Sequence, residues 1–116
     1  MDLPFEQGTF DYASISMALH EKERSSRDGV ISEMRRVVKQ SGVLVIVDYR
    51  VPYPRDAFGR AAGLVEQMAG RDHFRCFREF IEDGGVDSLL RRHGLREDKR
   101  EHAGRMPISI LKVRNS

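Results

Sequence analysis

Five consecutive apolar residues, Val43 to Val47, constrain the fold of this 116-residue chain more than any other feature. They follow Gly42 and end at the polar residue Asp48. A run without alternation between apolar and polar residues is typical of a strand buried on both faces, as found at the centre of a parallel sheet. We therefore expect residues 43 to 48 to form a central strand of an α/β sheet.

A helix is predicted directly before this strand, from Ser25 to Gly42, because apolar residues recur there at helical spacing. Ser25 or Ser26 is expected to cap its N-terminus, and Gly42 to end it in the left-handed conformation. Residues 10 to 17 precede it, and their aromatic, β-branched and small side chains favour a buried strand. Strand, helix and strand form a right-handed crossover in nearly all known cases, so residues 10 to 17 and 43 to 48 are predicted to be parallel neighbours.

The remaining chain is predicted to be helical from residue 55 to 93 and to end in an antiparallel hairpin. Gly70 and the pair Gly84-Gly85 are the expected helix breaks. Three apolar stripes mark the helices: Phe58, Ala61, Ala62, Val65, Met68 and Ala69; Phe74, Phe77, Phe80 and Ile81; and Val86, Leu89 and Leu90. Segments 95 to 101 and 106 to 114, separated by Gly104, are the expected hairpin strands.

The composition indicates one soluble domain over residues 1 to 116, with 40% hydrophobic and 33% charged residues. The net charge is +2 and the arginines are spread along the chain, which argues against a nucleic-acid partner. No apolar run approaches the ~18 residues of a membrane span. The single Cys76 excludes an internal disulfide and suits a reducing compartment, so we expect a cytoplasmic protein without membrane association.

Three segments resemble the class I S-adenosylmethionine-dependent methyltransferases, and most of all those of ubiquinone and menaquinone biosynthesis. They read LPFEQGTFDYASISMALHE, VISEMRRVVKQSGVLVIVDYR and LLRRHGL, in the order that the family has. The resemblance implies a partial Rossmann-like sheet, with residues 10 to 17 as the fourth family strand, residues 43 to 48 as the fifth and the hairpin as the sixth and seventh. Helices would lie mainly on one face of this C-terminal half of the family fold.

The family holds S-adenosylmethionine against a glycine-rich turn after its first strand. That turn lets the backbone approach the ligand where a β-carbon would collide. The 116 residues contain no G-x-G-x-G sequence, so the first three strands and the turn are expected to be absent from this chain. Two hypotheses follow: a small-molecule methyltransferase that is incomplete or inactive as an isolated chain, and a non-catalytic interaction or remnant module that dimerises or completes a split methyltransferase.

The resemblance also implies candidate site residues at the carboxyl ends of the parallel strands, where open α/β sheets bind ligands. Ser16, Met17, Ala18 and Leu19 would line the methionine part of the cofactor, and Leu3, Pro4 and Phe5 would follow the segment that contacts adenine. His20 is the candidate general base. His20, Asp48, Tyr49 and Arg50 are candidate substrate contacts. The alternative interpretations are the end of a buried strand for Ser16 to Leu19 and a solvated loop residue for His20. For Asp48, Tyr49 and Arg50 the alternative is a strand end that turns polar at the surface.

No metal site is predicted. His73 and Cys76 are spaced to share one helix face, but the sequence shows neither a third ligand nor a group that would orient a thiol nucleophile. The phenylalanine stripe from Phe74 to Phe80 is interpreted as core, with a substrate lid as the alternative.

The missing strands would leave one sheet edge and one apolar sheet face uncovered, and both invite association. We therefore expect a homodimer through that face or edge, or a separate chain that supplies the missing half.

Overall fold

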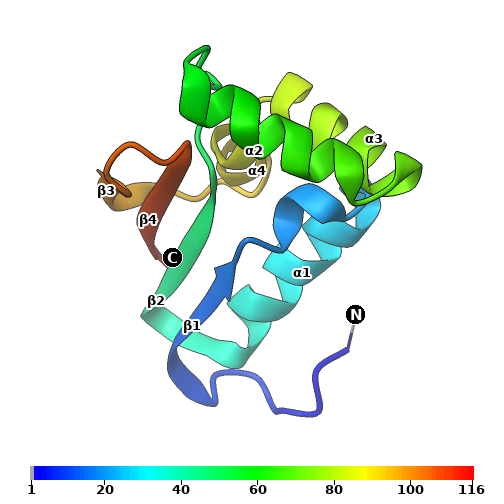
Figure 1. The fold of residues 1–116 in the computed structure, drawn as a ribbon. Coiled ribbons are helices and arrows are strands. Elements are labelled where there is room, and N and C mark those ends of the chain that lie inside the picture. Colours follow the sequence, from blue (N-terminus) through cyan, green and yellow to red (C-terminus); the bar gives the residue numbers. More distant parts are fainter. Residues whose placement is uncertain (1) are drawn as a thin grey trace.

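The computed structural model describes residues 2–116, which form one four-stranded sheet with helices behind and above it (Figure 1). In chain order the elements are β1 (Phe10–Ser16), the 3-10 helix η1 (Leu19–Glu21), α1 (Arg24–Val37), β2 (Val38–Tyr49), α2 (Ala57–Met68), α3 (Arg71–Glu82), α4 (Gly85–Arg92), β3 (Glu97–His102) and β4 (Ile108–Arg114). The strand order is β1-β2-β4-β3. β1 and β2 are parallel, whereas β4 is antiparallel to both β2 and β3. The predicted fold class is confirmed.

One face of the sheet forms the hydrophobic core. The core side chains of the strands, Leu44, Ile46, Leu111 and Val113, are at most 1% exposed and cluster with apolar residues of α1 and α4. In Figure 1 α4 lies farther back in the view, behind α2. Val43, Val45 and Val47 point to the opposite face and are only half-buried. The apolar run was predicted to be buried on both faces of the sheet. Within residues 2–116 it is fully buried on one face only.

The junction between α1 and β2 differs from the prediction. The helix ends at Val37 instead of Gly42, and Glu23 is its N-cap, so Ser25 and Ser26 lie inside the first turn. Gly42 lies within β2, where an added β-carbon would come 2.6 Å from the carbonyl oxygen of Asp11. Gly42 is therefore required for close approach to β1 and does not cap the helix.

Asn115 closes the end of α1 from the far terminus of the chain. Its Nδ2 donates to the carbonyl oxygens of Arg35 and Val38, both at 3.0 Å. The last carbonyls of a helix have no partner within it, so a buried amide from another element satisfies them. This contact ties the last residues of the chain to the β1-α1-β2 unit.

Most of the apolar stripe predicted for α2 does not face the core. Phe58, Val65 and Met68 are 42%, 63% and 79% exposed, whereas Glu66 on the same helix is 8% exposed. A helix normally buries its apolar stripe and leaves carboxylates in water. The inward position of Glu66 therefore requires polar partners beneath α2.

The other sequence expectations for the C-terminal half are confirmed. The helix breaks fall at Gly70 and Gly84, both with positive φ, and Gly104 lies in the turn of the β3-β4 hairpin. The buried side chains of α3 and α4 include Phe77, Phe80, Val86, Leu89 and Leu90, so these two apolar stripes are core.

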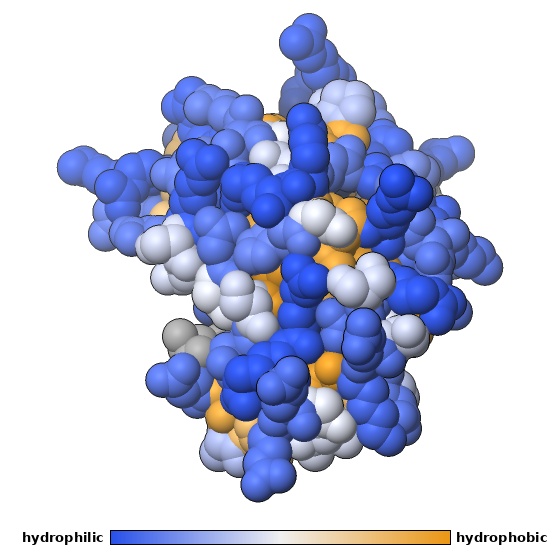
Figure 2. Space-filling model, turned by 180° about the vertical axis from the view of Figure 1, so that it is seen from behind, coloured by the Kyte–Doolittle hydropathy of each residue, from blue (hydrophilic) through white to orange (hydrophobic). Residues whose placement is uncertain are grey.

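The face of the molecule on the side opposite to Figure 1 is dominated by polar side chains (Figure 2). Seen from the side opposite to Figure 1, the molecule is mostly hydrophilic, and apolar atoms show only between charged groups (Figure 2). Among residues 2–116, none of the helices combines the length and the hydropathy needed to cross a bilayer.

The segment before β1 is held against α1 by one ion pair. Glu33 Oε2 accepts from the backbone N–H of Leu3 at 3.1 Å, and Arg36 donates to the carbonyl oxygens of Leu3 at 3.0 Å and Phe5 at 2.8 Å. Glu33 and Arg36 also bind each other at 2.8 Å. The hydrogen bonds from Arg36 and Leu3 lower the pKa of Glu33 from 4.5 to about 2.

This depressed pKa predicts a pH effect on stability. A carboxyl group whose pKa is lower in the folded protein contributes stability that is fully present above its unfolded pKa and is lost as pH falls toward the folded value. The Glu33 contribution should therefore disappear between pH 4.5 and about 2. We expect Glu33→Gln to flatten the decline of the unfolding free energy across this range, measured by urea denaturation. Glu6→Gln removes an exposed carboxylate of the same segment and should leave the decline unchanged.

Candidate functional site

Five polar side chains converge at the carboxyl ends of β1 and β2, beneath α2 and α3. His20 comes from η1, Asp48 and Tyr49 end β2, Glu66 comes from α2 and His73 from α3. Their carboxylate, phenol and imidazole groups form one connected hydrogen-bonded and ionic network. We refer to these five residues as the polar cluster.

Asp48 holds the segment after β1 against β2. Its Oδ2 accepts from the backbone N–H groups of Leu19 at 3.0 Å and His20 at 3.3 Å. Its Oδ1 accepts from the backbone N–H of Tyr49 at 2.8 Å and lies 2.8 Å from Nδ1 of His20. The Asp48 side chain is fully buried, so these bonds replace the water that a carboxylate otherwise requires.

His20 lies between two carboxylates. Nδ1 faces Asp48 at 2.8 Å and Nε2 faces Oε1 of Glu66 at 3.2 Å, while the residue is only 3% exposed. Burial alone would lower the pKa of His20, but the hydrogen bond and negative charge of Asp48, together with the charge of Glu66, raise it above the ordinary value. His20 is therefore a buried, carboxylate-bound histidine and not a solvated loop residue.

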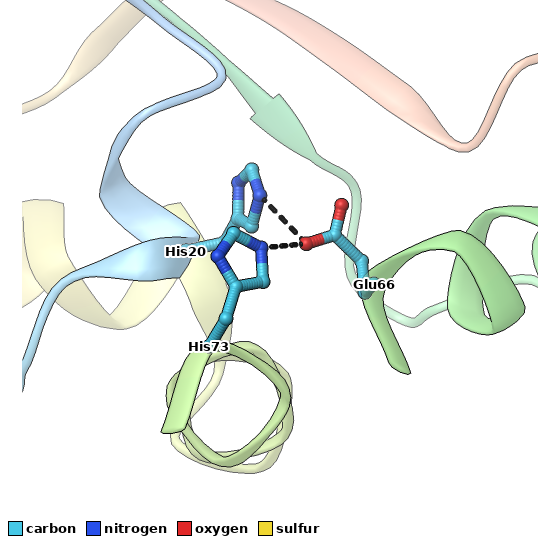
Figure 3. A group of neighbouring side chains, drawn as sticks. All are labelled: His20, Glu66 and His73. Atoms are coloured by element: carbon cyan, nitrogen blue, oxygen red, sulfur yellow. Dashed lines mark hydrogen bonds and ion pairs between the residues drawn. The ribbon is translucent and has the colours of Figure 1, made fainter. Parts of the chain in front are cut away.

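Glu66 connects the two histidines to Tyr49. Its Oε1 binds Nε2 of both His20 and His73, which point toward it from η1 and α3 (Figure 3). Its Oε2 accepts from the hydroxyl of Tyr49 at 2.8 Å. Burial alone would raise the pKa of Glu66, but the hydrogen bonds from Tyr49 and His73 lower it, so the buried carboxylate stays ionised. Burial and the Glu66 charge raise the pKa of Tyr49, which keeps its proton.

A buried arginine fixes η1 against α3. Nε of Arg27 donates to the carbonyl oxygen of Leu19 at 2.9 Å, and Nη2 donates to that of Cys76 at 2.8 Å. Its guanidinium stands 5.1 Å from the ring centroid of Phe80 and 3.5 Å from the carboxylate of Glu79. Arg27 thus positions the backbone on which His20 is mounted.

The structure brings together some of the sequence-predicted site residues. Ser16 to Leu19 form the end of β1 and the turn after it, and the backbone N–H of Met17 donates to the carbonyl oxygen of Val47 at 2.7 Å. Met17 has a φ of 53°, which directs the chain into η1. Arg50 leaves β2 beside Pro107. Leu3, Pro4 and Phe5 lie instead along α1 at the start of β1, so they are not beside Ser16 to Leu19.

Three members of this region were not predicted from the sequence as parts of one site. Glu66 lies within an apolar helical stripe, and Arg27 has no sequence feature that distinguishes it from the other arginines. The spacing of His73 suggests only Cys76 as a partner. The one local signal was the break in the α2 stripe at Glu66. These residues meet because α2 and α3 fold back over the strand ends, which no local spacing encodes.

An apolar cleft of about 820 Å³ opens beside the polar cluster, between α2 and α3. Tyr53, Phe74 and Phe77 supply aromatic walls, and Arg55, Arg60 and Arg78 also line it. The rings of Tyr53 and Phe77 contact Tyr49, with centroids 5.8 and 5.0 Å away. The cleft and the polar cluster therefore share a wall.

Comparison with known proteins identifies the fold. Residues 1–46 match the sequence profile of a family described as a methyltransferase domain. An uncharacterized methyltransferase of Synechocystis sp. is 41% identical over 51 residues. A SAM-dependent methyltransferase from Aquifex aeolicus superposes with a TM-score of 0.63 at 18% identity, and the mitomycin 7-O-methyltransferase MmcR with 0.64 at 18%. The resemblance to class I S-adenosylmethionine-dependent methyltransferases is confirmed.

The chain spans only part of each of these methyltransferases. The match covers 44% of this chain and 24% of the Synechocystis protein. The superpositions cover 99% of this chain and 50% of the Aquifex protein, and 91% of this chain and 30% of MmcR. The two superpositions thus include the β1-α1-β2 unit and most of the helices and hairpin that follow, whereas the Synechocystis match is limited to 51 residues.

The role of Asp48 predicts a stability effect. In Asp48→Asn the amide NH₂ would face backbone N–H donors, so at least one buried polar group loses its partner. We expect the unfolding free energy to fall by about 1–3 kcal/mol, measured by urea denaturation. Asp11→Asn removes an exposed carboxylate at the other end of β1 and should change stability by less than about 0.5 kcal/mol. Equal stability of the two variants would contradict the central role of Asp48.

Proposed function

We propose that this chain forms the acceptor-side part of an S-adenosylmethionine-dependent methyltransferase acting on a small molecule. The observation that carries the proposal is the segment Ser16 to His20, which Asp48 pins at the carboxyl ends of two parallel strands in a methyltransferase fold. In open α/β sheets this is where ligands bind. Ser16 to Leu19 would line the methionine end of the cofactor, and catalysis would come mainly from positioning the acceptor in line with the sulfonium.

The cleft between α2 and α3 suits an aromatic or apolar acceptor that carries a negative charge. Its walls include the aromatic rings of Tyr53, Phe74 and Phe77, and three arginines lie along it. Arginine presents a fixed fork of donors to carboxylates and phosphates. An oxygen acceptor is supported by the similarity to MmcR, whose name describes an O-methyltransferase.

The general-base role of His20 stays a prediction that requires a conformational change. Nε2 of His20 faces Glu66 at 3.2 Å, so an acceptor hydroxyl reaches it only after α2 moves the carboxylate away. Asp48 and Tyr49 would then act on the acceptor indirectly, because both side chains are buried and hydrogen-bonded. Cys76 is a buried free thiol, which fits a cytoplasmic enzyme.

The isolated 116-residue chain is proposed to bind the cofactor weakly, since it contains no G-x-G-x-G turn. We expect calorimetric titration with S-adenosylhomocysteine to show no saturable micromolar binding. A chimera that places the N-terminal part of the Synechocystis relative before this chain should bind. Within the chimera Ser16→Tyr should abolish binding, whereas Ser32→Tyr on the exposed side of α1 should not.

Two outcomes of this titration would contradict the proposals. Saturable micromolar binding by the isolated chain would contradict the proposal that this chain alone binds the cofactor weakly. A folded chimera that binds no cofactor, or a Ser16→Tyr chimera that binds normally, would overturn the cofactor role of the segment after β1.

The second candidate function is an interaction module that pairs with another copy of itself through the uncovered sheet face. This face carries Tyr12, 70% exposed, and Ile110, 36% exposed, on either side of the half-buried valines of β2. β1 pairs only with β2, so its other edge leaves backbone groups unpaired within residues 2–116. Apolar faces and open edges of this kind favour association.

Sedimentation velocity tests this pairing. We expect the wild-type chain to form a dimer at micromolar concentration and Tyr12→Lys to shift it toward monomer, because two buried ammonium groups would face each other. Val65→Lys changes an apolar side chain on α2 that is 63% exposed and should leave the dimer intact. A monomeric wild-type chain would contradict pairing through the sheet, as would a dimer that dissociates in Val65→Lys but not in Tyr12→Lys. Binding of a separate chain to this face would overturn the homodimer in favour of a complex of two different chains.

A further inference from the structure

Two histidines and a glutamate from three separate elements direct ligand atoms to one point. One such atom from each of His20, Glu66 and His73 lies within 4.8 Å of the other two. Figure 3 shows the three side chains pointing toward one another from η1, α2 and α3. Two imidazole nitrogens and one carboxylate oxygen are the ligand set of many catalytic zinc sites, which keep a further position open.

Polar groups behind these side chains orient them as metal ligands. Asp48 Oδ1 lies 2.8 Å from Nδ1 of His20 and accepts its hydrogen bond, so an ion that displaces the proton on Nε2 would meet a lone pair directed toward Glu66. The Tyr49 hydroxyl donates to Oε2 of Glu66 at 2.8 Å, which leaves Oε1 directed into the cluster. Histidines that bind metals usually donate their other N–H to a carboxylate or carbonyl, and ligating carboxylates are themselves hydrogen-bonded.

The third ligand has a similar arrangement at the rim of the cluster. Nε2 of His73 contacts Oε1 of Glu66, and its Nδ1 lies 3.8 Å from Oε2 of Glu21. The His73 side chain is 26% exposed, whereas those of His20 and Glu66 are 4% and 10% exposed. The side of His73 is therefore the side from which an ion would enter.

We propose that His20, Glu66 and His73 form a binding site for a divalent ion of the Zn²⁺ type. Imidazole and carboxylate ligands suit borderline ions such as Zn²⁺ better than hard ions such as Mg²⁺ or Ca²⁺, which prefer oxygen alone. The inference rests on the side-chain geometry and not on the proposed methyl transfer. A bound ion would connect α2 and α3 to η1 at the ends of the strands.

The orientation of α2 supports the proposal. This helix buries Glu66 while Leu64, Val65 and Met68 remain exposed, so its packing favours one carboxylate over three apolar side chains. A buried carboxylate is costly unless it is paired or coordinates a metal. A bound cation would offset that cost and would relieve the crowding of two imidazole nitrogens on one carboxylate oxygen.

Metal titration of the untagged, chelator-treated full chain tests the site. We expect one equivalent of Zn²⁺ to bind in competition with a chromophoric chelator and to raise the melting temperature, because a ligand that binds the folded state stabilises it. Co²⁺ should give visible d-d absorption bands of a low-coordinate site with the same stoichiometry. Absence of saturable binding of both Zn²⁺ and Co²⁺ would show a purely hydrogen-bonded cluster and overturn the proposal.

Ligand variants locate the ion. His73→Ala and Glu66→Gln should abolish one-equivalent binding, and circular dichroism checks that both variants fold. His102→Ala removes an exposed histidine of the β3-β4 hairpin, and Cys76→Ala removes the cysteine next to His73 on its helix face; both should bind Zn²⁺ as the wild type does. Binding that survives both His73→Ala and Glu66→Gln, or that is lost in Cys76→Ala, would place the ion elsewhere and overturn the assignment.

Tyr49 is a positioning residue in this proposal. Tyr49→Phe removes the hydroxyl that orients Glu66 and keeps the aromatic ring. Loss of such an outer partner typically weakens metal binding by about 10- to 100-fold, so we expect a Zn²⁺ affinity reduced by at least about 10-fold with stoichiometry unchanged. An unchanged affinity would show that Tyr49 does not orient the ligand.

Discussion

The buried carboxylate of Asp48 organises the end of the sheet where all proposed chemistry lies. It accepts three backbone N–H groups and faces the ring of His20, so one side chain fixes the turn after β1, the end of β2 and the orientation of an imidazole. An ionised carboxylate without such partners would be strongly destabilised in the interior. The same bonds that allow Asp48 to be buried therefore hold η1 in place and direct the ring of His20 toward Glu66.

The helices above the strand ends contribute the remaining members of the network that contains Asp48. α2 contributes Glu66 and α3 contributes His73, while Arg27 of α1 joins η1 to the α3 backbone. Five elements, η1, α1, β2, α2 and α3, thus meet in a network of opposite charges and hydrogen bonds. Such a network is strong only when every member is satisfied, which makes the arrangement specific and sensitive to single substitutions. The aromatic wall of the neighbouring cleft contacts the same network through Tyr49.

The two faces of the sheet have different roles. The covered face holds the core, with Leu44 and Ile46 fully buried between α1 and α4. The opposite face carries half-buried valines and the exposed Tyr12, and the chain spans half or less of the methyltransferases reported above. We therefore propose two functions for this part of the molecule. The strand ends would form part of a methyltransferase site, and the uncovered sheet face would bind another copy of the chain or a separate chain.

The sequence alone determined the parallel strand pair, the helix between the strands, the three later helices and the terminal hairpin, because each depends on local periodicity, apolar runs and glycine positions. It also placed His20, Asp48 and Tyr49 at strand ends. It misjudged the end of α1 and the role of Gly42, since close approach to the Asp11 carbonyl is a contact between strands. The inward direction of Glu66 and its meeting with His20 and His73 were decided only by tertiary structure. Helical periodicity predicts that the apolar side chains of α2 face the core, and the attraction of Glu66 to the buried His20, the part-buried His73 and the Tyr49 hydroxyl outweighs it.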